Sequence, residues 1–201
     1  MAKSTSKHCP WCDGVSEAYT RYHHDEWGVP CVDDAVQFEF LLLESAQAGL
    51  SWSTVLHKRA GYREAFAGFD VDKVARFNKR KIEALIKNPA IIRNRLKITA
   101  AVNNAQRFLE VQDEIGSFTR YIWSFVDGRP KQNRWRHQSD VPATSPESDA
   151  LSKDLKRRGF KFVGSTIIYA HMQATGLVND HITSCFRFAE CRQLGERMKP
   201  Q

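Results

Sequence analysis

The spacing of apolar residues predicts a protein built almost entirely of helices. In most segments apolar side chains recur every three or four positions, and no series of alternating apolar and polar residues predicts a sheet. Asp33 and Asp34 can cap a helix through Phe38 and Glu44, which Gly49 ends. Further helices are expected from Ser51 toward Phe66, from Asp70, over 81–87, over 96–111, from Ser148 and over 163–176. We therefore expect an all-α fold.

Three segments lack a clear helical period. Residues 119–126 are short and aromatic, which is compatible with a helix or a strand. Residues 127–147 contain three prolines and many polar groups, and are typical of a long loop. The residues after about Phe188 are charged, and we expect a loose tail there.

The length and apolar content limit the class of protein. With 201 residues, the chain can form one domain or two small lobes that share a core. No stretch contains the roughly 18 apolar residues needed to cross a bilayer, so no membrane association is expected. The first residues contain no apolar signal segment, and we expect a cytoplasmic protein.

The charge suggests a polyanionic partner. Thirty Lys and Arg residues against 23 Asp and Glu give a net charge of +7, which favours a nucleic acid, although solubility alone could explain it. Basic residues concentrate over 79–97, around the break at Asn88 and Pro89. This segment is either a helix–hairpin–helix unit, whose backbone amides hold a DNA phosphate, or an ordinary charged helix connection. Smaller clusters at 134–136 and 156–161 are equally ambiguous.

The cysteines point to a metal site more than to disulfides. Five cysteines without a secretion signal argue against a disulfide framework. His181 and Cys185 would share one helix face at a spacing that suits zinc, and could equally be core residues. Near the other end of the chain, the further ligands on offer are Cys9, Cys12, His23 and His24. A dithiol redox role for the CPWC motif at 9–12 is disfavoured because no strand precedes it.

Aromatic residues and one carboxylate form a second candidate site. Trp11, Tyr19, Tyr22 and Trp27 lie near the N-terminus and Trp52 follows a glycine turn. Such a cluster is usually core, but near a basic surface it could also stack on a nucleobase. Glu44 shares a helix face with apolar residues, so it must pair with a cation, reach solvent or open into a pocket.

Long motifs in order identify a family. The chain contains Glu44 and the segments YHHDEWGVP (22–30), QAGLSW (47–52), IIRNR (91–95), WSFV (123–126), SDALSK (148–153), RGFKFVG (158–164) and GLVNDH (176–181). Over about residues 9–185 the sequence resembles the bacterial type I 3-methyladenine DNA glycosylases. Residues 127–147 and 186–201 have no clear counterpart, and the connection around 88–95 lacks the glycine-rich turn of typical helix–hairpin–helix motifs.

The resemblance implies a fold and a metal. It implies one glycosylase domain over 1–190, with a helix–hairpin–helix lobe at about 45–126, a zinc lobe from about 1–32 and 148–190, and a tail at 191–201. One structural Zn²⁺ per chain would be held by Cys9, His23, His181 and Cys185, with Cys12 as the alternative to Cys9. A site with four protein ligands is structural because no position is open for water.

The resemblance also implies an activity and its residues. A monomer would bind double-stranded DNA that contains alkylated bases, flip out 3-methyladenine and hydrolyse its glycosidic bond, leaving an abasic site without lyase activity. Trp11, Tyr22, Trp27 and Trp52 would contact the base, and Glu44 would accept its hydrogen bonds as the catalytic carboxylate. DNA contacts would come from Gly49, Leu50, Arg93, Arg95 and Lys97. The alternative is a zinc-stapled DNA-binding module without catalysis, which would have no use for a carboxylate among stacked rings.

Overall fold

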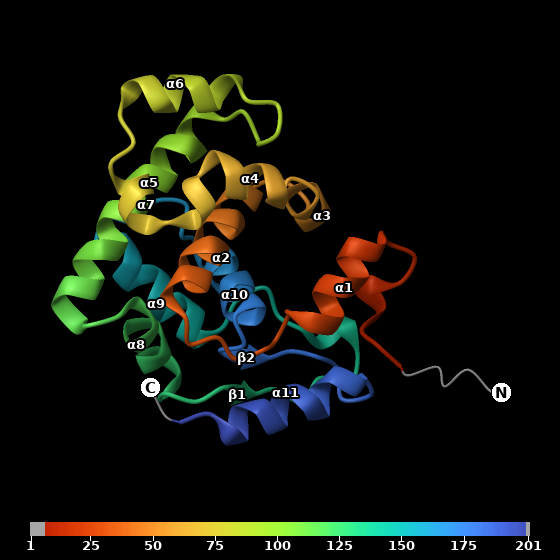
Figure 1. Ribbon diagram of the computed structural model, residues 1–201. Helices are drawn as coiled ribbons and strands as arrows, with labels where there is room; N and C mark the ends of the chain where they lie inside the picture. The colour runs from red at the N-terminus through yellow and green to blue at the C-terminus, as the bar shows by residue number, and fades with distance from the viewer. Residues whose placement is uncertain (1–6, 200–201) are drawn as a thin grey trace.

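The computed structural model describes residues 7–199, and most of them are helical (Figure 1). In chain order the helices are α1 (Glu17–Asp25), α2 (Asp34–Gln47), α3 (Trp52–Leu56), α4 (Arg59–Ala65), α5 (Val71–Ala75), α6 (Lys79–Lys87), α7 (Arg95–Ile115), α8 (Phe118–Trp123), α9 (Pro146–Arg157), α10 (Ser165–Ala174) and α11 (Phe186–Arg197). Short 3-10 turns are η1 (Pro10–Cys12), η2 (Ala67–Phe69), η3 (Ser124–Val126) and η4 (Gln138–Asp140). No described helix is both long and apolar enough to span a membrane.

Helix α2 is the centre of the fold. Asp33 caps it, since its carboxylate accepts a hydrogen bond from Ala35 N at 2.8 Å. Residues 37–46 are all buried, which is expected of a helix that is largely apolar on every side. Helices α7, α8 and α10 pack around it, and α2 and α10 lie together in the middle of Figure 1. This position places the last turn of α2 inside the molecule.

The structure confirms the mostly helical expectation and changes several boundaries. The segment from 51 to 66 is two helices, α3 and α4, rather than one. Helix α7 begins at Arg95 and runs to Ile115, where Gly116 ends it at φ +96°. The ambiguous segment 119–126 is helical, as α8 and η3. The expected loop contains β1 (Lys131–Gln132), which pairs in parallel with β2 (Val178–Asn179).

The expectation of a loose C-terminal tail is wrong, because residues 186–197 form helix α11. Cys191 is 1% exposed, and Gly195 packs so closely that a Cβ there would lie 2.8 Å from Pro130 Cγ. These two small residues are one helical turn apart, so the buried face of α11 is narrow. Charged residues surround this face, and the sequence therefore shows no clear apolar stripe. Phe186 N also donates to Lys7 O at 2.9 Å, which joins the beginning of α11 to the first described residue.

Gly176 fixes the segment after α1 against the end of α10. Its φ is +71°, and a Cβ would lie 2.4 Å from Pro30 N and from the carbonyl carbon of Val29. On the same edge, Gly28 N and Cys31 N donate to Gln173 O and Thr175 O, each at 3.0 Å. A residue other than glycine would therefore meet both backbone strain and a direct clash with the neighbouring chain.

We expect Gly176→Ala to lower the free energy of unfolding by more than about 2 kcal/mol, measured by urea titration. Gly116→Ala is the matched control, because Gly116 also has a positive φ but has nothing within 4 Å of a Cβ. The control should lose only the strain of a left-handed alanine, about 1 kcal/mol. Equal losses of unfolding free energy in Gly176→Ala and Gly116→Ala would show that the close approach of residues 29–30 to Gly176 contributes nothing to stability.

Candidate functional site

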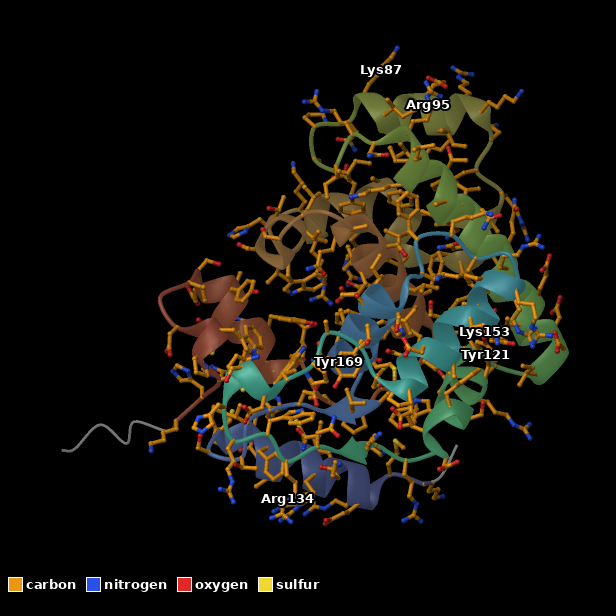
Figure 2. The ribbon with its side chains drawn as sticks, turned by 180° about the vertical axis from the view of Figure 1, so that it is seen from behind. Lys87, Arg95, Tyr121, Arg134, Lys153 and Tyr169 are labelled. Atoms are coloured by element: carbon orange, nitrogen blue, oxygen red, sulfur yellow. The ribbon has the colours of Figure 1, made fainter. Side chains whose placement is uncertain are left out.

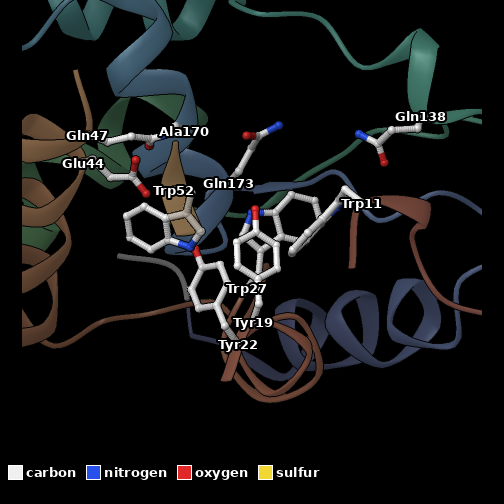
Figure 3. Close-up of a pocket in the computed structure, with 10 residues that line it drawn as sticks. All are labelled: Trp11, Tyr19, Tyr22, Trp27, Glu44, Gln47, Trp52, Gln138, Ala170 and Gln173. Atoms are coloured by element: carbon white, nitrogen blue, oxygen red, sulfur yellow. The ribbon is translucent and has the colours of Figure 1, made fainter. Parts of the chain in front are cut away.

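A cavity of about 200 Å³ opens between α1, α2 and α10. Its lining side chains come from segments far apart in the sequence and converge on one space (Figure 3). They are Trp11 of η1, Tyr19 and Tyr22 of α1, Trp27, Glu44 and Gln47 of α2, Trp52 of α3, Gln138 of η4, and Ala170 and Gln173 of α10. All five residues predicted from the sequence to contact a base therefore lie around a single pocket.

The aromatic residues make two walls of this pocket. Trp11 and Trp27 meet with ring centroids 5.1 Å apart and planes at 76°, and Tyr22 and Trp52 meet at 5.2 Å and 46°. Local sequence helps to position the second pair, because Ser16 caps α1, which carries Tyr22, and Ser51 caps α3, which begins at Trp52. Flat faces on two sides of a narrow cavity suit a planar aromatic ligand.

Glu44 is a buried carboxyl group without a partner. It lies in the last turns of α2, is 3% exposed, and its Oε2 has no hydrogen-bond partner among the described residues. Burial raises the pKa of Glu44 to about 8, because no cation in the described part of the chain compensates for the lost hydration. The sequence left three possibilities for Glu44, namely an ion pair, exposure to solvent or a place in a pocket. The structure shows the third, because the Glu44 side chain faces the pocket (Figure 3). Such a group is poised to bind a cation or hydrogen-bond donors.

Sequence reasoning missed several residues that line the pocket. Gln47 lies one turn after Glu44 within the QAGLSW motif, so the helical period could have indicated it. Gln173 reaches the pocket from α10, where its amide donates to Asp180 Oδ2 at 2.8 Å. Gln138 comes from the long segment 127–147, and its buried Oε1 has no partner among the described residues. No periodic pattern in that segment could have pointed to it.

The turn after α2 forms the rim next to the pocket. Gly49 has φ +75° and Leu50 is 42% exposed, beside a second cavity of about 220 Å³. Lys97 Nζ donates to Ala46 O at 2.8 Å and to Ala48 O at 2.6 Å. A cation on the last carbonyls of α2 is favourable and ties α7 to this turn. Lys97 thus positions the turn in this structure.

Helix α6, the connection after it and the beginning of α7 form an outward-facing tip of the molecule, from which Lys87 and Arg95 project (Figure 2). Asn94 caps α7 by accepting from Lys97 N at 3.1 Å. Arg95 makes a two-pronged ion pair with Glu83, whereas exposed Arg93 has no ion pair among the described residues. The three predicted DNA-contacting cations therefore lie in one region but in different environments.

Four buried side chains from both ends of the chain form a candidate metal centre. Cys9, His23 and His181 are fully buried and Cys185 is 3% exposed, and one ligand atom from each lies within 4.8 Å of all the others. Cys9 Sγ and Cys185 Sγ each lie 3.6 Å from His181 Nδ1, and Cys185 Sγ lies 3.6 Å from His23 Nε2. Tetrahedral zinc with ordinary bond lengths places sulfur and nitrogen about 3.6 Å apart.

The surroundings of this centre also suit a metal ion. His181 Nε2 donates to Trp27 O at 2.9 Å, which leaves Nδ1 without a proton and turned toward the two cysteines. Contact with Cys9, together with the two imidazoles, holds the pKa of the Cys185 thiol below its usual value. The four residues could therefore hold a metal ion. Cys9 rather than Cys12 joins His181 and Cys185, since Cys9 Sγ and not Cys12 Sγ belongs to this group of mutually close ligand atoms.

Comparison with known proteins places the chain in a family. A family model described as methyladenine glycosylase matches residues 11–188. The chain belongs to this family. DNA-3-methyladenine glycosylase 1 of Escherichia coli (strain K12) is 47% identical over 176 residues, which cover 87% of this chain and 94% of that protein.

Solved structures agree with this assignment and confirm the resemblance seen in the sequence. A crystal structure of 3-methyladenine DNA glycosylase I has a TM-score of 0.87 at 48% identity, covering 90% of this chain and 98% of that one. A variant of a 3-methyladenine DNA glycosylase I, solved in complex with 3-methyladenine, has a TM-score of 0.85 at 39% identity over 87% of this chain and 95% of its own.

In this methyladenine glycosylase the candidate metal centre and the pocket share structural elements. Trp11 follows Cys9 by two residues and its ring centroid lies 5.0 Å from that of His23. Trp27 packs against His181 at 4.6 Å and accepts its hydrogen bond. Disturbing the four-residue centre should therefore move one aromatic wall of the pocket.

Proposed function

We propose that this chain is a DNA glycosylase that hydrolyses the N-glycosidic bond of 3-methyladenine in alkylated DNA and leaves an abasic site. The observation that carries the proposal is Glu44, an unpaired buried carboxyl group inside a pocket with aromatic walls. Family membership gives the reaction class, because the relatives are named DNA-3-methyladenine glycosylases. A solved relative holds 3-methyladenine itself.

Charge complementarity explains how such a pocket selects the damaged base. Methylation at N3 gives adenine in DNA a positive charge. Electron-rich rings attract a cation at their faces, and ionised Glu44 can accept hydrogen bonds from the exocyclic amine and the ring edge. Normal adenine is neutral, so it gains neither the attraction of a cation to the ring faces nor the charge-assisted hydrogen bonds to Glu44. Its binding therefore does not offset the free energy needed to ionise Glu44 and to flip the base out of the duplex.

The same charge simplifies the chemistry. A cationic base is already a good leaving group, so the enzyme need not protonate it before the glycosidic bond breaks. Binding holds the flipped nucleotide with its base in the pocket while water attacks the sugar carbon. No lysine lines the pocket in the described structure, so we propose a monofunctional enzyme without lyase activity.

We propose that DNA lies across the face formed by the turn after α2 and the α6–α7 connection. Leu50, which is 42% exposed beside the pocket rim, would fill the gap left by the flipped base, with Gly49 allowing the tight turn. Backbone amides near Asn94 and the side chains of Arg93 and Arg95 would contact phosphates, in a helix–hairpin–helix arrangement. Lys97 would contribute mainly by holding the turn in place.

We propose that Cys9, His23, His181 and Cys185 hold one Zn²⁺ per chain. Two thiolates and two imidazoles at these separations match zinc, and four protein ligands leave no position for a reactive water. When bound, the ion supplies a structural cross-link between the two ends of the chain. Its effect on catalysis is through Trp11 and Trp27, which these ligands position.

The activity is tested by counting abasic sites in a methylated duplex. After incubation with the purified chain, we expect strand breaks to appear on heating in alkali and not before it, because a monofunctional enzyme leaves the sugar–phosphate backbone intact. A bifunctional glycosylase run in parallel shows that strand breakage by a lyase would be detected before the alkali step. DNA binding without alkali-labile sites would instead indicate the DNA-binding module without catalysis.

Arg93→Ala should weaken DNA binding to any sequence and reduce the salt dependence of the binding constant. Loss of one phosphate contact lowers the slope of log K against log salt by about 0.9. Arg134→Ala is the matched control, since it removes the same charge from the opposite end of the molecule (Figure 2). Equal slopes for the two variants, from fluorescence anisotropy at several salt concentrations, would contradict the proposed DNA face.

A further inference from the structure

A second group of metal-binding side chains lies next to the four-residue centre. Cys12, His23 and His24 each offer a ligand atom within 4.8 Å of the other two. A fourth donor adjoins them, because His8 Nδ1 lies 3.3 Å from Cys12 Sγ. Cys12 is 2% exposed, and His8 and His24 are half-buried. Cys12, His23 and His24 thus offer one sulfur and two nitrogen atoms close together, and His8, which lies outside this group of three, adjoins it through Cys12.

The free nitrogen of His23 points to a ligand in this group. A metal-binding histidine nearly always hydrogen-bonds through its second ring nitrogen, and His181 does so to Trp27 O. His23 is fully buried, its Nε2 faces Cys185, and its Nδ1 has no partner among the described residues. His24 Nε2 is also buried without a partner. Two buried nitrogens without a hydrogen-bond partner, in residues that belong to one candidate metal-binding group, call for an explanation.

We propose that Cys12, His8, His24 and Nδ1 of His23 bind a second divalent transition metal ion of the zinc type. His23 would then bridge two ions, through Nε2 to the first centre and through Nδ1 to the second. The donor set of one thiolate and three imidazole nitrogens suits Zn²⁺. The present separation of 3.3 Å between Cys12 Sγ and His8 Nδ1 is close to the roughly 3.6 Å of a tetrahedral site.

A metal ion that binds at this second site displaces protons from its ligands and has a carboxylate nearby to balance its charge. The incoming cation displaces the proton of the Cys12 thiol and, because Nε2 of His23 already serves the first centre, the proton on Nδ1. Asp13 Oδ1 lies 3.3 Å from His8 Nδ1 and adds a negative charge next to the ion. Proton release should therefore accompany uptake of the second ion.

The second metal site would restrain the pocket wall that contains Trp11, at the Cys12 end of η1. The 3-10 turn η1 carries Trp11 between Cys9 and Cys12, so each end of the turn would be attached to a metal ion. Because the Trp11 ring packs on His23 and on Trp27, the second ion should make this wall more rigid. Occupancy of the second site should therefore alter tryptophan fluorescence.

The test is the number of ions bound per full-length chain. Protein is equilibrated with excess Zn²⁺, passed through a desalting column and analysed for metal, with circular dichroism to confirm folding. We expect two ions in the wild type and one in His24→Gln and His8→Gln. Cys31→Ser and His57→Gln, which change the same residue types elsewhere, should retain two. His8→Gln alters a half-buried position near the chain end, so it still decides the question if His24→Gln fails to fold.

Cobalt substitution then tests the bridge. Two Co²⁺ ions joined by one imidazolate couple magnetically, whereas the single ion in His24→Gln gives the uncoupled signal of a two-sulfur, two-nitrogen site. One ion in the saturated wild type would overturn the proposal, and so would two ions in both histidine variants. No ion in the wild type would contradict the first centre as well, which separates failure of the zinc proposal from failure of this one.

Discussion

Replacing Glu44 with glutamine should slow excision of 3-methyladenine by about 30- to 1,000-fold. An amide can accept only one of the hydrogen bonds offered by the base edge and carries no charge to balance the cation. Loss of a charge-assisted contact in a buried site costs on the order of 2–4 kcal/mol, and each 1.4 kcal/mol is tenfold in rate. Single-turnover release from methylated DNA measures the effect.

In Glu44→Gln, the pH dependence that Glu44 gives to protein stability and to the excision rate should disappear. The pKa of Glu44 in the folded protein is about 8 against an ordinary 4.5, so the folded state favours the protonated group. As pH rises from about 5 to 8, the wild type loses stability relative to Glu44→Gln, and above 8 the difference is constant. Glutamine should therefore raise the free energy of unfolding at pH 8 by a few kcal/mol. Excision by the wild type should rise with pH toward 8, because ionised Glu44 binds the cation.

Glu39→Gln is the matched control for this prediction. Glu39 is equally buried on the same helix, but it is paired with Arg59 at 2.7 Å and Arg63 at 2.8 Å. Its loss removes an ion-pair partner from exposed Arg63 and from partly buried Arg59, which keeps Glu26, so stability should fall while the pocket carboxyl group is unchanged. Equal excision rates in wild type and Glu44→Gln would remove Glu44 from base reading, and lower stability of Glu44→Gln at pH 8 would contradict its unpaired burial.

Cys185→Ser should lose the metal ion and several kcal/mol of unfolding free energy. A hydroxyl group does not replace the thiolate in a tetrahedral centre, and the binding energy of a structural metal is part of the folding energy. Metal analysis and urea titration of the purified variant measure both effects. Excision should also fall, because Trp11 and Trp27 pack against the ligands His23 and His181.

Cys31→Ser controls for the loss of a thiol. The Cys31 thiol donates only to Asp33 O, at 3.7 Å, and lies outside the cluster. This variant should keep its metal and nearly all its stability. Full metal occupancy in Cys185→Ser would contradict the ligand assignment, whatever happened to stability.

The parts of the fold that follow from local chemistry could be predicted from the sequence. Helix α2 has a capping aspartate, a long apolar run and a terminal glycine, and each of these acts within a few residues of itself. Helix α11 could not be predicted, because its stability comes from Cys191 and Gly195 packing on residues distant in the chain. Charged neighbours hide so narrow a contact.

The candidate site also has features that could be predicted from the sequence and features that only the fold determines. The position of Glu44 on an apolar helix face was visible in the sequence, and the structure shows that this face opens into a pocket. The candidate metal ligands could be proposed from residue types, but only the fold brings Cys9 to His181. Gln138 was invisible because the loop that carries it has no period. The ion pair of Arg95 with Glu83 depends on side-chain positions that spacing does not determine.

The most direct test of the proposed activity is chromatography of the bases released from methylated duplex DNA at a stated low salt concentration. The wild-type protein, folded and containing metal, should release 3-methyladenine and little else, because this lesion combines a cationic ring with the hydrogen-bonding edge of adenine that Glu44 would contact. Release of no base, or of 7-methylguanine at a comparable rate, would contradict a pocket in which Glu44 reads the damaged adenine.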